Sequence, residues 1–164
     1  MKKYHYALLS GGFDPVHVGH LAMIKEAKKI AEKVIILLNS DKWLLRKKGK
    51  PFMIESQRAQ ILEEFGSISK VIIQNNDDDD SSNNAIISFT KENIGKSICY
   101  CNGGDRSDKK KIREAETCHK YGVDLIFGVG GVHKLESSSD LTKNYLSDVE
   151  KRPWGNFHII AKGN

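Results

Sequence analysis

The amino-acid sequence predicts an α/β fold, in which a doubly wound parallel five-stranded sheet has helices on both faces. Short apolar runs alternate with longer amphipathic ones five times, as in β/α units joined by right-handed crossovers. The run at 33–38 is almost wholly apolar, which is typical of a strand buried on both faces. Both observations favour a Rossmann-like sheet over an antiparallel one.

The individual elements follow from the same patterns. The expected strands are 6–9, 33–38, 71–73, 97–101 and 124–127. The expected helices are 18–31, 54–65, 84–93, 109–119 and a last one that begins near Ser138. We expect a basic loop at 46–51 and a polar surface loop at 77–84, whose four carboxylates offer Mg²⁺ binding as the alternative. Because ligands bind beyond the carboxyl ends of parallel strands, site residues are expected in the loops that follow strands.

The composition is that of an ordinary globular domain, with 164 residues, 39% hydrophobic and 29% charged. No apolar run approaches the roughly 18 residues of a membrane helix, and the N-terminus lacks the pattern of a signal peptide. We therefore expect a cytoplasmic protein without a membrane partner. One domain is expected at 1–147, followed by a C-terminal tail at 148–164.

The net charge of +5 suits anionic ligands. The basic residues are dispersed and no nucleic-acid reader motif accompanies them, so small polyphosphates are expected rather than nucleic acid. The three cysteines, Cys99, Cys101 and Cys118, have no CxxC spacing, which argues against a disulfide framework or a structural zinc site. We expect them in the core, with a metal site shared with His119 as the alternative.

The first loop predicts a phosphate site. Gly11 and Gly12 end the first strand, where they let the backbone turn tightly and approach a ligand. His17 and His20 are three residues apart, so at a helix start they lie on one face, and Gly19 between them leaves room for a phosphate. The helix N-terminus adds unpaired N–H groups and the positive end of the helix dipole. The loop therefore predicts a polyphosphate site with two imidazole donors, with two histidines that merely cap a helix as the alternative.

The stretch 12–20 resembles the HxGH signature of the cytidylyltransferase-like nucleotidyltransferase superfamily. That superfamily includes glycerol-3-phosphate cytidylyltransferase, the nucleotidylyl domain of ADP-heptose synthase and the adenylyltransferases of coenzyme A and NAD synthesis. The resemblance implies an enzyme of the EC 2.7.7 type, possessing a Rossmann-like fold and using Mg²⁺ bound with a nucleoside triphosphate. It implies that His17 and His20 contact the triphosphate and stabilise transition-state charge. Phe13 and Gly19 would line the nucleotide, and Asp14 would contact the substrate.

Two further blocks resemble the heptose and glycerol phosphate branch of that superfamily. The first is the Asn-Ser-Asp at 39–41, and the second is Lys48-Gly49 ahead of a helix that carries Arg58. The resemblance implies that Lys48 meets phosphate as a catalytic cation, and that Asp41 and Arg58 lie near the substrate. The alternative for 46–51 is an exposed basic loop. Which cation makes the phosphate contact stays open among Arg46, Lys47 and Lys48.

The remaining motifs lie in the second half of the chain. The Gly-Gly-Asp at 103–105 resembles the family's turn beside the nucleotide, which implies nucleotide contacts for Gly104 and Asp105, with an ordinary glycine turn as the alternative. Ser138 and Ser139 stand where the family has a phosphate-binding Ser/Thr motif at a helix start, although serines are also ordinary N-caps. The arginine of that motif is missing here, and Lys134 is the nearest cation.

These motifs lead to a nucleotidyltransferase that moves a nucleotidyl group from CTP or ATP to a small phosphorylated alditol or sugar and releases pyrophosphate. The alternatives are an adenylyltransferase of cofactor synthesis, of the pantetheine phosphate type, and a catalytically weakened nucleotide-binding module. A homodimer is compatible with the resemblance. The Pro-Trp-Gly within the tail resembles the first strand of the cupin-like domain of type II mannose-6-phosphate isomerases, with a terminal strand or loose tail as the alternative.

Overall fold

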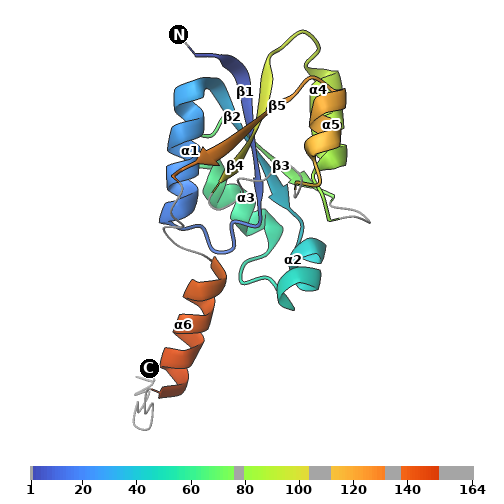
Figure 1. Cartoon of the computed structure of the whole chain (residues 1–164). Coiled ribbons are helices and arrows are strands. Elements are labelled where there is room, and N and C mark those ends of the chain that lie inside the picture. The colour runs from blue at the N-terminus through green and yellow to red at the C-terminus, as the bar shows by residue number, and fades with distance from the viewer. Residues whose placement is uncertain (1, 76–79, 104–111, 132–137, 152–164) are drawn as a thin grey trace, which may run out of the picture.

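The computed structural model describes residues 2–75, 80–103, 112–131 and 138–151, and five parallel strands form its sheet in the order β3-β2-β1-β4-β5. Figure 1 shows the twisted sheet at the centre of the molecule. The strands are β1 (Tyr4–Gly11), β2 (Ala31–Asn39), β3 (Lys70–Gln74), β4 (Ile98–Gly103) and β5 (Asp124–Val129). The predicted α/β fold is confirmed, and the five expected strands all form.

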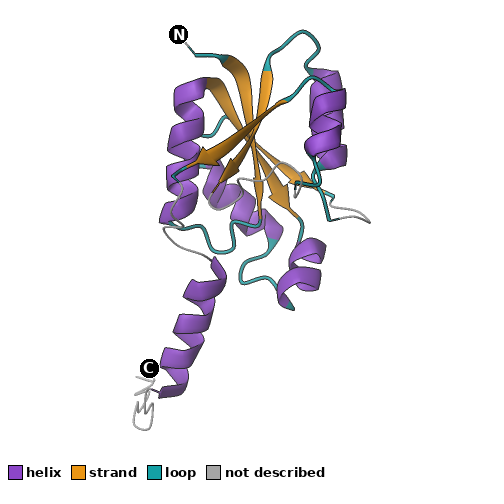
Figure 2. Ribbon diagram, viewed as in Figure 1, coloured by secondary structure: helices purple, strands orange, loops and turns teal. Residues whose placement is uncertain are grey.

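Helices cover both faces of the sheet (Figure 2). The helices are α1 (Val18–Ile30), α2 (Asp41–Lys48), α3 (Glu55–Glu63), α4 (Asn83–Glu92), α5 (Ala115–Lys120) and α6 (Ser138–Lys151). One core cluster contains buried residues of α1 and α3, and the other contains buried residues of α4 and α5. The predicted doubly wound arrangement is therefore confirmed.

Strand β2 shows why its sequence is a continuous apolar run. Ile36 and Leu38 pack into the cluster with α1 and α3, whereas Ile35 and Leu37 pack into the cluster on the opposite face. All four side chains are at most 2% exposed. A strand covered on both faces has no polar face to present, so the alternation of a half-buried strand is lost.

The expected basic loop at 46–51 is wrong for its first half, because Arg46, Lys47 and Lys48 form the last turn of helix α2. The Ser40 hydroxyl caps the helix start, and Gly49, at φ +84°, ends it by donating its N–H to the Leu45 carbonyl at 3.0 Å. This helix is short and mostly polar and buries Leu44, so its sequence lacks the long apolar pattern that predicts a helix.

The expected surface loop at 77–84 also needs correction. Asn83 and Asn84 belong to α4, and Ser81 and Ser82 are buried. The Ser82 backbone N–H donates to the Glu114 carboxylate at 2.8 Å, which joins this segment to the start of α5. Residues 77–79, and 109–111 of the expected fifth helix, lie outside the described residues. Helix α5 itself begins at Ala115, later than expected.

The three cysteines are buried, as expected. Cys99 and Cys101 share the core cluster with α1 and α3, with their Sγ atoms 3.8 Å apart, whereas Cys118 packs on the opposite face of the sheet. Burial raises the pKa of the Cys118 thiol to about 12. The sheet separates Cys118 from the other pair, so the three thiols do not converge on a shared metal site.

Within the part of the chain that the structure describes, no helix is long and apolar enough to cross a membrane. Helix α6 runs from Ser138 to Lys151 and so continues past the expected domain boundary at 147. The remainder of the tail, including its Pro-Trp-Gly, lies outside the described residues. The boundary and the second domain stay predictions.

Candidate active site

The two histidines of the first loop cap the N-terminus of α1. His17 is the N-cap, with extended backbone, and its Nδ1 accepts the Gly19 N–H at 3.1 Å. His20, three residues on, accepts the backbone N–H of His17 through its own Nδ1 at 3.2 Å. This reciprocal pattern is a capping box, with imidazoles in the places that a serine and a glutamate usually take. It brings the two rings to a centroid distance of 3.8 Å.

These hydrogen bonds fix the protonation of both rings when they are neutral. Because each Nδ1 accepts a backbone N–H, it carries no proton, and the single proton of the neutral ring must be on Nε2. His17 and His20 therefore each present one Nε2–H donor at the N-terminus of α1. Two neutral donors at the positive end of the helix dipole make a site for an anion.

His20 stays neutral at physiological pH. Its side chain is partly enclosed, and its ring lies 4.4 Å from the ring of Phe13, centroid to centroid. Burial, with the positive charges of His17 and Lys48, lowers the pKa of His20 from 6.5 to about 3. Burial also lowers the pKa of Lys48. A polyanion bound beside them would raise the pKa of both His20 and Lys48, because its negative charge favours the protonated forms.

Lys48 is the cation of α2 that reaches the first loop. Its Nζ donates to the backbone carbonyl of Asp14 at 3.2 Å. Arg46 and Lys47 instead form ion pairs with Asp80, from the segment that precedes α4. The structure thereby separates the three contiguous cations, and it is Lys48 that lies beside the histidine loop.

Asp14 holds the first loop against the segment that leads into α3. Its carboxylate oxygens accept the backbone N–H groups of Phe52, at 2.7 Å, and Met53, at 2.8 Å. The residue is 2% exposed. Sequence reasoning missed this role, since an aspartate that binds backbone N–H groups far along the chain leaves no pattern of its own. A contact between Asp14 and substrate is not part of this geometry and stays a prediction.

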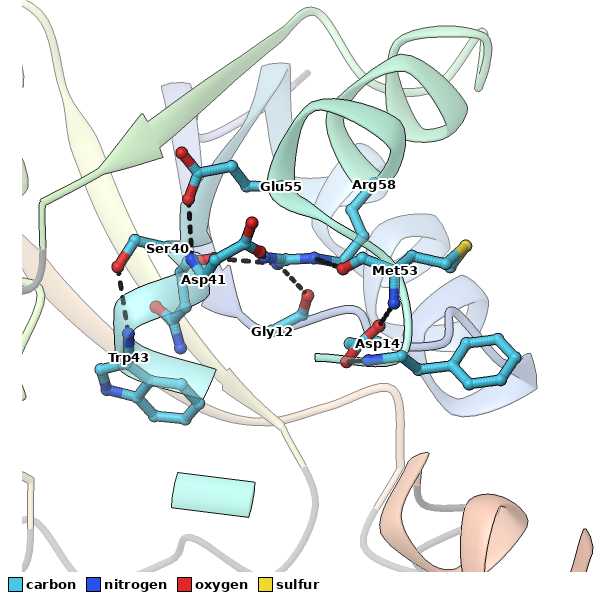
Figure 3. A network of polar contacts seen from close by, with 10 residues as sticks. Gly12, Asp14, Ser40, Asp41, Trp43, Met53, Glu55 and Arg58 are labelled. Carbon is cyan, nitrogen blue, oxygen red and sulfur yellow. Dashed lines mark hydrogen bonds and ion pairs between the residues drawn. The ribbon is translucent and has the colours of Figure 1, made fainter. Parts of the chain in front are cut away.

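Arg58 is the buried centre of the polar network in Figure 3. Its Nη1 donates to the carbonyls of Gly12 at 2.7 Å and Asn39 at 2.8 Å, which belong to the ends of the first loop and of β2. Its Nε donates to the Met53 carbonyl at 2.9 Å, and its Nη2 to the Asp41 carboxylate at 2.7 Å. The guanidinium is fully enclosed. It therefore joins three loops, while the contact with substrate that the resemblance implies stays a prediction.

Asp41 opens helix α2 beside this network. Its carboxylate pairs with Arg58, and its backbone N–H donates to the Glu55 carboxylate at 2.7 Å (Figure 3). An acidic residue in the first turn of a helix also complements the helix dipole. Asp41 thus ties the start of α2 to the start of α3, and Glu55 is a member of the network that sequence reasoning did not single out.

The glycines of the site allow close packing. A Cβ on Gly12 would lie 3.0 Å from Leu44 of α2, and one on Gly11 would lie 3.2 Å from the ring of Phe13. A Cβ on Gly103, at the end of β4, would lie 2.1 Å from the Met23 sulfur of α1. Each glycine therefore lets a neighbouring element pack directly on the carboxyl end of a strand.

Helix α6 begins beside the histidine loop. The Ser138 hydroxyl donates to the Pro15 carbonyl at 2.8 Å, and Ser139 is exposed one residue later. Both residues thus lie at the expected helix start. Gly104 and Asp105 lie outside the described residues, so their nucleotide contacts stay predictions.

The pieces meet at the carboxyl edge of the sheet, where strand order reverses next to β1. Comparison with known proteins then decides the family, since the sequence model of the cytidylyltransferase-like family matches residues 8–157. The chain belongs to the cytidylyltransferase-like family. The match contains every residue of the network described above, and it confirms the resemblance drawn from the HxGH stretch.

Individual proteins agree with this membership. The chain is 34% identical over 66 residues to an FAD synthase of Archaeoglobus fulgidus, covering 40% of this chain and 47% of that protein. It is 35% identical over 102 residues to the bifunctional protein HldE of Campylobacter jejuni (strain RM1221), covering 61% of this chain and 20% of that one. The aligned regions thus span about half of the FAD synthase and a fifth of HldE.

A solved structure shares the fold. It is a bifunctional NMN adenylyltransferase/ADP ribose pyrophosphatase of Francisella tularensis, complexed with AMP and a manganese ion. The TM-score is 0.56 at 20% identity, covering 88% of this chain and 42% of that one. At this identity the likeness shows the fold, and it agrees with the parallel sheet of the family.

Proposed function

We propose that the chain transfers a nucleotidyl group from CTP or ATP to a small phosphorylated alditol or sugar and releases pyrophosphate. The observation that carries the proposal is the pair of Nε2–H donors that His17 and His20 present at the N-terminus of α1, with Lys48 beside the same loop. Fixed donors around a helix start suit the charge that develops on a triphosphate during transfer.

The reaction needs no general base from the protein. A phosphate monoester has a second pKa of about 6, so at neutral pH it is largely the dianionic nucleophile. One of its oxygens forms a bond to the α-phosphorus of the triphosphate, while the bond from that phosphorus to the β-bridging oxygen breaks and pyrophosphate leaves. His17, His20 and Lys48 would align the phosphates in line and donate to their oxygens.

The described carboxylates do not form a metal site of their own. Both oxygens of Asp14 accept backbone N–H groups, and one oxygen of Asp41 pairs with Arg58. No group of three His, Cys, Asp or Glu side chains within the described ranges is placed to hold a metal. We infer that Mg²⁺ would arrive bound to the triphosphate; the similar Francisella tularensis protein is complexed with AMP and a manganese ion. Such an ion neutralises charge on the phosphate oxygens.

A second candidate is adenylyl transfer in cofactor synthesis. The names FAD synthase and NMN adenylyltransferase both describe proteins that make dinucleotide cofactors, and both are similar to this chain. Adenylyl transfer uses the same histidine loop and the same in-line chemistry. It differs in the acceptor and, where the first proposal uses CTP, also in the base of the triphosphate, so the choice is one of specificity.

Pyrophosphate release separates these possibilities. CTP and ATP would each be offered with glycerol phosphate, a sugar phosphate, flavin mononucleotide, nicotinamide mononucleotide and pantetheine phosphate. Release with an alditol or sugar phosphate supports the first proposal, and release only with a cofactor precursor and ATP supports the second. Triphosphate binding without release in any combination identifies a nucleotide-binding module and contradicts both transfer proposals.

A further inference from the structure

The last turn of α2 divides its three cations between two partners. Arg46 Nη2 lies 2.7 Å from one carboxylate oxygen of Asp80, and Lys47 Nζ lies 3.3 Å from the other. Lys48 instead reaches the histidine loop, where it donates to the Asp14 carbonyl. One acidic residue therefore pairs with both Arg46 and Lys47.

Asp80 contacts α2 at more than these two charges. Arg46 donates to the same carboxylate oxygen a second time through Nε, at 3.0 Å, and the Trp43 indole N–H donates to the Asp80 carbonyl at 3.3 Å. Asp80 itself has φ +57°, a conformation that few residues other than glycine adopt. A left-handed aspartate that meets three residues of one short helix is a specific docking point for that helix.

The two ends of α2 are held differently. Its start is fixed by the Ser40 cap and by the contacts of Asp41 with Arg58 and Glu55. An eight-residue helix is not stable alone in water, so its far end needs tertiary contacts to hold a direction. Asp80 supplies polar contacts at that end through Arg46 and Lys47.

We propose that Asp80 is a positioning residue for the phosphate site, because it holds Arg46 and Lys47 so that Lys48 is directed at the histidine loop. The inference rests on the proposed function insofar as it assigns Lys48 to the polyphosphate. The contacts of Asp80 with Trp43, Arg46 and Lys47 all lie on α2, so it acts through that helix, and its positioning effect requires Lys48.

Simple electrostatics predicts the opposite sign, which makes the proposal testable. Asp80 is a negative charge near a site for anions, so its neutralisation by Asp80→Asn would by itself strengthen phosphate binding. If Asp80 positions Lys48, the same substitution weakens binding, because α2 no longer directs that ammonium.

The ion pairs of Asp80 with Arg46 and Lys47 are also exposed to solvent, with side-chain exposure of 44% for Arg46 and 42% for Lys47, so salt weakens these pairs.

The test is a double-mutant cycle read by calorimetric binding of inorganic triphosphate. Asp80→Asn should weaken binding about fivefold or more in the wild-type background, and leave it equal or slightly tighter in a Lys48→Ala background, where only the charge effect remains. Asp80→Glu, which keeps the charge, should recover most of the affinity. Equal or tighter binding by Asp80→Asn, or equal losses in both backgrounds, would overturn the proposal. Absence of triphosphate binding by the wild type would overturn it as well.

Two controls separate positioning from damage to the fold. Glu26→Gln removes another exposed ion pair, that with Lys29 on α1, and should leave binding unchanged. Trp43 fluorescence, measured in a Trp154→Phe background, reports the contact between Asp80 and α2 directly. Asp80→Asn and added salt should both shift this emission in the same direction. Emission that neither change affects would contradict the contact. Turnover of the wild type is measured alongside. If the wild type binds triphosphate but releases no pyrophosphate, the proposed transfer is wrong, and the binding cycle still tests the role of Asp80.

Discussion

The guanidinium of Arg58 donates to the carbonyl of Gly12 at 2.7 Å, from a position where its side chain has no exposure to solvent. Glycine at that position carries the turn between β1 and the histidines, so the buried arginine holds the backbone of the phosphate loop itself. The same side chain also holds the end of β2 and the start of α2. The geometry of the histidine loop therefore depends on a residue that is inside the protein.

Replacement of Arg58 should destabilise the fold and not only weaken activity. Arg58→Met leaves three backbone carbonyls and the Asp41 carboxylate without their donor, and we expect a loss of about 3–5 kcal/mol in the free energy of unfolding. Urea denaturation measures it. Gln57→Ala, at the exposed neighbouring position, should change stability by no more than about 0.5 kcal/mol. A change of similar size in both variants would show that the network adds nothing.

The lowered pKa of His20 makes stability depend on pH. Its pKa is about 3 in the folded chain and 6.5 as the ordinary value, so between these pH values the unfolded state binds a proton that the folded state does not. Stability therefore falls as the pH falls from 6.5 towards 3, by up to about 1.4 kcal/mol per pH unit from this group. His20→Asn should show a correspondingly shallower dependence in denaturation curves from pH 7 to 5. Parallel curves for the two proteins would contradict the pKa shift.

The two nitrogens of His20 have separate roles that two amide side chains can distinguish. Asparagine places a polar atom near Nδ1 and can keep the cap to His17, whereas glutamine places its amide near Nε2. We expect His20→Asn to keep more stability and His20→Gln to keep more pyrophosphate release. Loss of the Nε2–H donor should cost about 10²–10³ in kcat. The reverse order of activities would show that the cap, and not the donor, serves the reaction.

The fold and the histidine loop were predictable because both depend on the pattern of residues that are close together along the chain. Alternating apolar runs determine the strands, and the three-residue spacing of His17 and His20 determines that they share a helix start. Both predictions depend only on neighbours along the chain.

What the sequence did not predict depends on partners far along the chain. Asp14 binds N–H groups of Phe52 and Met53, and Arg58 is enclosed by carbonyls from three loops. A charged residue in a motif suggests contact with a ligand, and only the fold shows that these two also hold distant segments of the backbone together. Helix α2 was missed for a related reason, because its stability comes from caps and ion pairs more than from an apolar face.

The final prediction concerns Met23, which packs against the ends of β4 and β5. A Cβ on Gly103 would lie 2.1 Å from its sulfur and 2.9 Å from its Cγ, so Gly103→Ala should cost about 1–3 kcal/mol of stability through overpacking. Because the two nearest contacts are with a side chain, Met23→Ala should relieve most of the clash and leave the Val129 carbonyl oxygen at 3.2 Å, so the double variant should lose less than the sum of the single losses. We expect a coupling of about 1 kcal/mol or more in urea denaturation.

Gly130 provides the contrast that tests this explanation. A Cβ there would lie 2.8 Å from the backbone nitrogen of Met23 and 2.9 Å from its Cγ, at φ +91°, so truncation of Met23 removes only part of the conflict. Gly130→Ala should therefore stay destabilising in the Met23→Ala background. Gly122→Ala serves as the control, since at φ +67° it has backbone strain and no neighbour within 4 Å. It should show no coupling to Met23→Ala, and a coupling at Gly122 as large as that at Gly103 would mean that contact with Met23 does not set the cost.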